Sequence, residues 1–336
     1  MAHVFTLEAT DHLVPRWFSE GVSVFEEWRS GPNPGVRIPM SVYKAMADDR
    51  LLPISELDEG FIRPTYEEQV IVSYMQAGLV CQYIDQTYGP EKLRGMLAEF
   101  KDGALTAAAV ETVLEMTPAE FDERFADFVT AEHGEILANL PEWQNAQAEI
   151  GKHLGEENWS AIIALAEELI ELHPRYVEPD SPYLSLAKAA EETGDQDTAI
   201  NVLEQFWQHG GYAPGPLKRL AGWLYEQDRG VDAAKVYRTI NLIDPLDGDA
   251  HALFGDLLLE QDRPSDALRE YSVALALDPH DKAGAYYRVA KAQFALGDQK
   301  ASQGQLLLAL DVAPNYRPAQ RLLLEVMRAN TDNKAN

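Results

Sequence analysis

Basic residues and cysteines are both scarce in this chain of 336 residues. Lysine and arginine number 28 against 55 aspartates and glutamates, which gives a formal net charge of −27. Nucleic-acid backbones and anionic membrane surfaces would repel so acidic a chain, and we expect neither as a partner. The single cysteine, Cys81, excludes an internal disulfide, and its apolar helical surroundings predict a buried small side chain.

Long apolar runs and several catalytic signatures are absent as well. No run of eighteen apolar residues occurs, so we expect no transmembrane segment, and the first residues lack the basic region of a signal peptide. There is no paired Ser-His-Asp set, no phosphate-binding glycine loop and no four-cysteine metal site. With 46% hydrophobic residues, the chain can nevertheless bury a core and form two domains.

The C-terminal half repeats at a fixed period. Pro245, Pro279 and Pro314 are spaced by 34 and 35 residues, and each closes a stretch with the pattern helix, short turn, helix. One helical hairpin cannot cover its own apolar face, so neighbouring hairpins must stack and share a core. We expect about five hairpins within residues 143–330, ending in a cap helix at Arg317–Ala329.

The stretch Gly248–Pro279 is similar to the tetratricopeptide repeat, whose period is about 34 residues. Phe254 and Gly255 supply a large and then a small residue in the first helix, and Ala267 stands where the two helices cross closely. The resemblance implies an α-solenoid, which specifies an architecture and not an activity.

Tetratricopeptide repeats line their concave face with the first helix of each hairpin, and such faces usually bind peptides or proteins. Here that helix carries basic and aromatic residues, namely Lys188, Lys218, Tyr225, Tyr287, Arg288 and Lys291. A basic, aromatic groove in an acidic chain predicts a protein or peptide partner with an acidic segment. The alternative is that these are ordinary solvated positions. The carboxylate clamp of some relatives is not matched, because Gly222 stands where asparagine is expected.

The N-terminal half is also predicted to be helical, which makes the whole fold all-α. Apolar residues recur at helical spacing, and Gly89-Pro90 and Thr117-Pro118 are helix boundary signals. We expect helices at Val14–Trp28, Tyr66–Tyr88, Glu91–Phe100, Thr106–Met116 and Pro118–His133.

His3 and Glu20 are the most informative residues of this half. In an H-E-x-x-H helix, two histidines four residues apart share one face and hold zinc, and the glutamate polarises the metal-bound water. A His-Glu pair directly before Met1 would give the junction His-Glu-Met-Ala-His. We therefore expect the sequence to begin inside such a motif.

The first 130 residues or so resemble the gluzincin metallopeptidases, in particular the peptidase MA-like group. The resemblance rests on His3-Val4-Phe5, on Val14-Pro15-Arg16-Trp17-Phe18-Ser19-Glu20-Gly21, and on the helix that ends at Tyr88-Gly89. It implies that residues 1–135 are the helical remnant of a zincin catalytic domain, incomplete at its N-terminus. It further implies that zinc is the cofactor and that the site residues are His3 and Glu20 as ligands, Glu26 or Glu27 in the second shell, and Tyr74 near an oxyanion.

The sequence is consistent with two functions. The first is the C-terminal part of a zinc-dependent metallopeptidase that carries a repeat scaffold for protein binding. Because the chain supplies two of the three protein ligands that a catalytic zinc needs, we expect weak zinc binding and no cleavage by the chain itself. The alternative is a non-catalytic tetratricopeptide-repeat scaffold. For Tyr74, packing is the alternative to catalysis.

Overall fold

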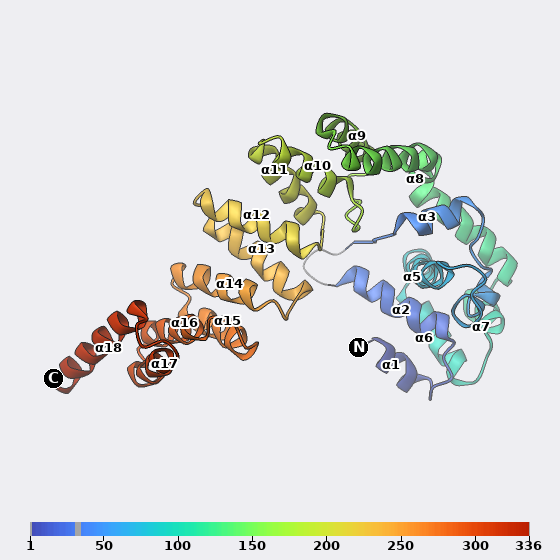
Figure 1. Ribbon diagram of the computed structural model, residues 1–336. Coiled ribbons are helices and arrows are strands. Elements are labelled where there is room, and N and C mark those ends of the chain that lie inside the picture. Colours follow the sequence, from blue (N-terminus) through green and yellow to red (C-terminus); the bar gives the residue numbers. More distant parts are fainter. Residues whose placement is uncertain (1, 31–34, 336) are drawn as a thin grey trace. The chain divides into compact units, whose positions relative to one another are not determined.

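The computed structural model describes residues 2–30 and 35–335, and the chain is 77% helical (Figure 1). No β-strand occurs in these described residues, which confirms the all-α prediction. The chain divides into two compact units, Met1–Ala189 and Ala190–Asn336. We call them the N-terminal unit and the C-terminal unit. Within the described part of the chain, no helix is long and apolar enough to cross a membrane.

The N-terminal unit is built around α5, which packs against α2, α3, α4, α6 and α8. Its helices are α1 (Ala2–Ala9), α2 (Arg16–Arg29), α3 (Met40–Ala47), the 3-10 turn η1 (Ile54–Glu56), α4 (Glu59–Ile62), α5 (Gln69–Tyr88), α6 (Pro90–Lys101), α7 (Thr106–Leu114), α8 (Pro118–Gly155) and α9 (Trp159–Leu172). Helix α10 (Pro182–Glu192) spans the division between the units. Cys81 is fully buried in α5, as predicted.

Two glycines let α2 and α5 approach closely. A Cβ atom on Gly21 of α2 would lie 2.6 Å from the carbonyl oxygen of Ala77, and one on Gly78 of α5 would lie 2.6 Å from Val24 Cγ1. Both distances are far below van der Waals contact, so only glycine permits this crossing. The crossing fixes the position of α2, which carries Glu20.

Helix α8 begins as predicted and ends much later. The Thr117 hydroxyl accepts a hydrogen bond from the Glu120 N–H, and the Glu120 carboxylate accepts one from the Thr117 N–H, so the expected capping box is present. The predicted end at His133 is wrong, because α8 continues through Pro141 to Gly155. Pro141 has no N–H to donate to the carbonyl group four residues earlier, so the helix lacks one backbone hydrogen bond there. Leu140 and Trp143 are buried beside it, and this burial stabilises the helix across the proline. The boundary predicted between residues 135 and 143 thus falls inside a single helix.

The C-terminal unit consists of hairpins in which each helix contacts the next one along the chain. After α10 come α11 (Gln196–Gln208), α12 (Pro214–Glu226), α13 (Gly230–Ile243), α14 (Gly248–Glu260), α15 (Pro264–Ala276), α16 (Lys282–Ala295), α17 (Gln299–Val312) and α18 (Arg317–Ala335). The repeat signature packs as expected, since a Cβ on Gly255 would lie 2.5 Å from the buried ring of Tyr271. Helix α18 caps the stack by burying Ala319, Leu322 and Val326 against α16 and α17.

Candidate functional site

The N-terminus of α2 is held in place by one tryptophan. The Trp17 N–H donates to Asp58 Oδ1 at 2.8 Å, and the Trp17 indole N–H donates to Thr106 Oγ1 at 3.0 Å. The Trp17 side chain is fully buried and packs edge-on against Phe18. These contacts fix the rotation of the first turn of α2 and therefore the direction of Ser19 and Glu20.

His3 of α1 lies directly against this turn. Its Nε2 atom is 3.0 Å from Glu20 Oε2, and its Nδ1 atom is 3.0 Å from Ser19 Oγ. The Ser19 hydroxyl is in turn 2.7 Å from the hydroxyl of Thr6. Ser19 and Thr6 are buried, whereas the His3 side chain is 45% and the Glu20 side chain 15% exposed. The hydrogen bond from Nδ1 to the buried Ser19 thus fixes the orientation of the imidazole ring. Its Nε2 atom and the Glu20 carboxylate lie next to each other near the surface.

The pair suits a zinc ion in the chemistry and spacing of its donors. Imidazole nitrogen and carboxylate oxygen are both zinc ligands, and two ligands of a tetrahedral zinc lie about 3.3 Å apart. A metal-binding histidine usually has its second ring nitrogen held by a hydrogen bond, as Ser19 holds Nδ1 here. Among the described residues, however, no group of three or more His, Cys, Asp or Glu side chains is arranged to hold a metal. The structure therefore provides two ligands.

Arg16 and Tyr74 lie on the other side of Glu20. Arg16 Nε is 3.4 Å from Glu20 Oε1, and the guanidinium stands over the ring of Phe61. A hydrogen bond to Tyr74, together with the contact to Glu20, raises the pKa of Arg16. Tyr74 also packs edge-on against Phe61, with ring centroids 5.0 Å apart. Tyr74 is thus connected to Glu20 through Arg16, which contacts both. No role was predicted for Arg16 from the sequence.

Glu26 and Glu27 are not brought to this cluster. Both are exposed, and Glu26 pairs with Arg29 at 3.2 Å. Six and seven residues of helix separate them from Glu20, a rise of about 9–10 Å that no hydrogen bond spans. Ser19 and Thr6 take the supporting position instead. The sequence does contain an indication of this, because Thr6 lies three residues after His3 and therefore on the same face of α1.

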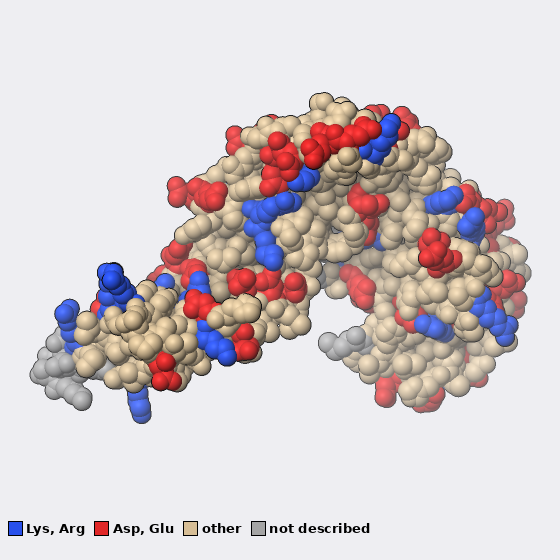
Figure 2. Space-filling view, in the orientation of Figure 1, with Lys and Arg blue, Asp and Glu red and all other residues tan. Residues whose placement is uncertain are grey.

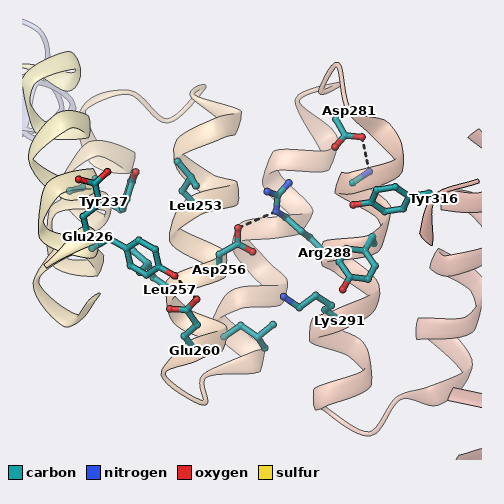
Figure 3. A pocket seen from close by; sticks show the side chains of 16 residues that line it. Glu226, Tyr237, Leu253, Asp256, Leu257, Glu260, Asp281, Arg288, Lys291 and Tyr316 are labelled. Carbon is teal, nitrogen blue, oxygen red and sulfur yellow. Dashed lines mark hydrogen bonds and ion pairs between the residues drawn. The ribbon is translucent and has the colours of Figure 1, made fainter. Parts of the chain in front are cut away.

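A second candidate site is a groove in the C-terminal unit. It has a volume of about 790 Å³ and lies along α12, α14 and α16 (Figure 3). Four of the predicted groove residues line it, namely Tyr225, Tyr287, Arg288 and Lys291. Lys218 is not in its lining and binds Asp247 with an N–O distance of 2.6 Å. Lys188 belongs to the N-terminal unit, where its ammonium lies 6.0 Å from the Trp159 ring.

The expectation of a basic groove is wrong. Carboxylates also line it, and Arg288 is paired with one of them, Asp256, at 3.2 Å. On the face shown in Figure 2, basic side chains stand in small groups with acidic side chains next to them. Glu226, Asp256 and Glu260 also belong to the first helices of the hairpins, and the prediction is wrong because it counted only the basic and aromatic residues of those helices.

Residues 1–131 match the family model described as the Peptidase MA superfamily. The match contains His3, Glu20 and Tyr74, and it confirms the resemblance that the sequence indicated for this part of the chain. Beyond residue 131 the chain continues into the helical hairpins of the repeats. A comparison with curated proteins finds no match.

Several solved structures of tetratricopeptide-repeat (TPR) proteins are similar to the chain. YrrB, described as a TPR protein with an unusual peptide-binding site, is 15% identical over 53% of this chain and 89% of its own, with a TM-score of 0.42. MamA from Desulfovibrio magneticus is 21% identical over 46% of this chain and 86% of its own, with a TM-score of 0.39. A thermophilic TPR protein from Thermus thermophilus is 17% identical over 55% of this chain and 98% of its own, with a TM-score of 0.32.

Proposed function

We propose that the N-terminal unit carries two ligands of a peptidase-type zinc site, His3 and Glu20, and that the C-terminal unit is a scaffold that binds a protein segment. The observation that carries the metal site is the 3.0 Å distance between His3 Nε2 and Glu20 Oε2, with Ser19 holding the other ring nitrogen. The family match over residues 1–131 supports it.

Each residue of the site would have a distinct role. Zinc supplies Lewis-acid chemistry that polarises a peptide carbonyl and activates water. Ser19 and Thr6 orient the His3 ring, and Arg16 orients the Glu20 carboxylate. Tyr74 and Arg16 would donate hydrogen bonds to a carbonyl oxygen as it gains negative charge. With two protein ligands, the 336-residue chain binds zinc weakly and hydrolyses no peptide bond.

The test is to complete the motif. Adding His-Glu directly before Met1 creates His-Glu-Met-Ala-His, and zinc binding is measured by isothermal titration calorimetry. We expect affinity to rise on the order of 100-fold as the site gains a third protein ligand. An Ala-Glu extension and the substitutions His3→Ala and Glu20→Gln in the extended protein are the matched controls. An extended protein that binds zinc no more tightly than these controls would refute the metal site.

Hydrolysis is assayed separately, with an unfolded protein as substrate and a chelator as control. Robust chelator-sensitive cleavage by the chain without the extension would contradict the proposal, because two ligands would then suffice. Cleavage by the extended protein alone would support it.

The second candidate function is a non-catalytic scaffold. The groove of about 790 Å³ favours it, since that site lies wholly in the C-terminal unit and needs no metal. An extended protein that binds zinc tightly and cleaves nothing would support this alternative, and the metal would then have only a structural role.

A further inference from the structure

Two partly buried histidines of the N-terminal unit lie against the same tyrosine. Tyr43 belongs to α3 and is buried. Its ring packs edge-on against His133 of α8, with ring centroids 5.6 Å apart, and against His173, which ends α9, with ring centroids 6.0 Å apart. The Tyr43 hydroxyl also lies 3.5 Å from His133 Nδ1. One side chain of α3 thus contacts both α8 and the end of α9.

The segment that follows α9 completes this cluster. Tyr176 packs against His173, with ring centroids 5.6 Å apart, and edge-on against Trp143 of α8, with ring centroids 5.0 Å apart. Tyr176 and Trp143 are both buried. We call Tyr43, His133, Trp143, His173 and Tyr176 the aromatic joint. It connects α3, which also packs against α5, to the hairpin of α8 and α9 (Figure 1).

The aromatic joint disfavours a positive charge on either histidine. Burial lowers the pKa of His133, and the charge of the neighbouring Glu132 offsets part of this effect. Burial, with a smaller contribution from the charge of His133, lowers the pKa of His173 from its ordinary 6.5 to about 4. Both rings are therefore neutral at pH 7.

The other carboxylates near the aromatic joint interact with its tyrosines. Asp180 accepts a hydrogen bond from the Tyr176 hydroxyl. Glu178 acts on Tyr43, whose pKa is raised by burial and, to a smaller extent, by this carboxylate. In the described part of the chain, neither histidine of the joint forms an ion pair with a carboxylate. A proton on either ring therefore needs water for its stabilisation, and water reaches the rings when they separate.

We propose that the aromatic joint is an acid-sensitive switch, in which protonation of His133 and His173 separates α3 from the hairpin of α8 and α9. The two imidazolium groups would repel each other, and each would be hydrated once the rings part. A protonated His133 also carries a hydrogen on Nδ1, so it can no longer accept a hydrogen bond from the Tyr43 hydroxyl. The contacts between α2 and α5 through Gly21 and Gly78 involve no histidine and persist.

The direction and size of the response follow from the protons that each form binds. The open form takes up protons with the ordinary histidine pKa of about 6.5, whereas the closed form holds the pKa of His173 at about 4. The closed form is therefore fully favoured above pH 6.5 and loses this advantage as pH falls toward 4. Between pH 7 and 4.5, His173 alone shifts the equilibrium toward the open form on the order of 50-fold. The switch depends on neither the zinc site nor the groove.

The experiment follows hydrogen exchange by mass spectrometry at pH 7 and 4.5, with labelling times scaled for the slower chemical exchange in acid. Three full-length proteins are compared: wild type, the double variant His133→Phe, His173→Phe, and a control, His12→Asn, His280→Asn. Phenylalanine keeps a ring in the aromatic joint but takes up no proton, and the control removes two exposed histidines elsewhere.

In wild type and control, residues 40–47 and 173–181 should lose protection on the order of 50-fold between pH 7 and 4.5. At pH 4.5 these segments should be less protected than α2 and α5, because α3 opens without them. The phenylalanine variant should keep the protection of both segments in acid. Equal protection of α3, α2 and α5 at pH 4.5 would overturn the proposal, since the unit would then open as a whole. An acid loss in the phenylalanine variant as large as in wild type would also overturn it.

A titration of the histidine rings of wild type by NMR does not depend on how well the variant folds. The signals of His133 and His173 should change to those of the protonated form over the same pH range in which residues 40–47 lose protection. Protonation of both rings while α3 remains protected would overturn the switch.

Discussion

The N-terminal unit is held together by residues far apart in the sequence, whereas the C-terminal unit is held together by neighbouring helices. In the N-terminal unit, Trp17 binds Asp58 and Thr106, and the Ile54 N–H donates to Asp122 at 2.9 Å. In the C-terminal unit, each helix from α11 to α18 contacts the next. The stability of a repeat array is approximately the sum of contributions from each repeat and from the interfaces between neighbours. A unit held by contacts between distant residues unfolds more cooperatively, because the loss of one contact weakens the others. The same kind of damage should therefore spread through one unit and stay local in the other.

The largest effect is expected for Trp17→Ala. Removing this buried ring leaves a cavity and takes the hydrogen-bond donor away from the Thr106 hydroxyl, so the N-terminal unit should lose about 3–5 kcal/mol of unfolding free energy. Hydrogen exchange followed by mass spectrometry should show lost protection throughout residues 2–30 and 35–189. Leu220→Ala in α12, also fully buried, is the matched variant, and its effect should be confined to α12 and adjacent helices. If protection were lost over equally large regions in the two variants, the two units would not differ in how far local damage extends.

Acid should destabilise the N-terminal unit through His173. Burial, with a smaller contribution from the charge of His133, lowers the pKa of His173 from its ordinary 6.5 to about 4. The folded unit therefore disfavours the protonated form, so this contribution to stability is complete above pH 6.5 and is lost as pH falls toward 4. Between pH 7 and 4.5 the loss is about 2 kcal/mol. Urea unfolding of wild type and His173→Gln at both pH values measures it, and an equal acid loss in the two proteins would contradict the assignment.

The sequence predicts the C-terminal unit well because its pattern recurs. Pro245, Pro279 and Pro314 follow the ends of α13, α15 and α17, and the small residue Gly255 faces Tyr271 as the repeat pattern requires. Each hairpin has the same pattern of apolar and small residues, so helix positions that are predicted correctly for one hairpin also apply to the next. The charge of the groove does not recur in this way, and there the prediction is wrong.

The part of the N-terminal unit before residue 143 offers no recurring pattern, and the sequence predicts less of it. The pairing of His3 with Glu20 follows from the family resemblance, but the residues that orient the pair do not. Glu26 and Glu27 are exposed, whereas Ser19, Thr6 and Arg16 make the contacts. Which side chains meet depends on how α1 and α2 pack, and that packing is set by the distant partners of Trp17.

A smaller effect is expected where α2 crosses α5. In Gly21→Ala the new methyl group would lie 2.6 Å from the carbonyl oxygen of Ala77, which is backbone and cannot rotate away. The helices must separate, at a cost of about 1–3 kcal/mol. Because α2 carries Glu20, the extended protein with His-Glu before Met1 should also bind zinc more weakly when it carries Gly21→Ala. Thermal unfolding and calorimetry check the two effects, and wild-type values for both would show that the crossing is less constrained than the distance indicates.

The smallest effect, and one of opposite sign, is expected for Gly304→Ala in α17. This glycine is exposed within a helix, and a Cβ there has no neighbour within 4 Å. Alanine should therefore stabilise the C-terminal unit by up to about 1 kcal/mol, because it loses less backbone freedom on folding. Urea unfolding monitored by circular dichroism measures the gain, with Gly21→Ala as the reference. The same added methyl group thus stabilises where the repeat surface is open and destabilises where two helices cross, and a loss of stability at Gly304 would remove that distinction.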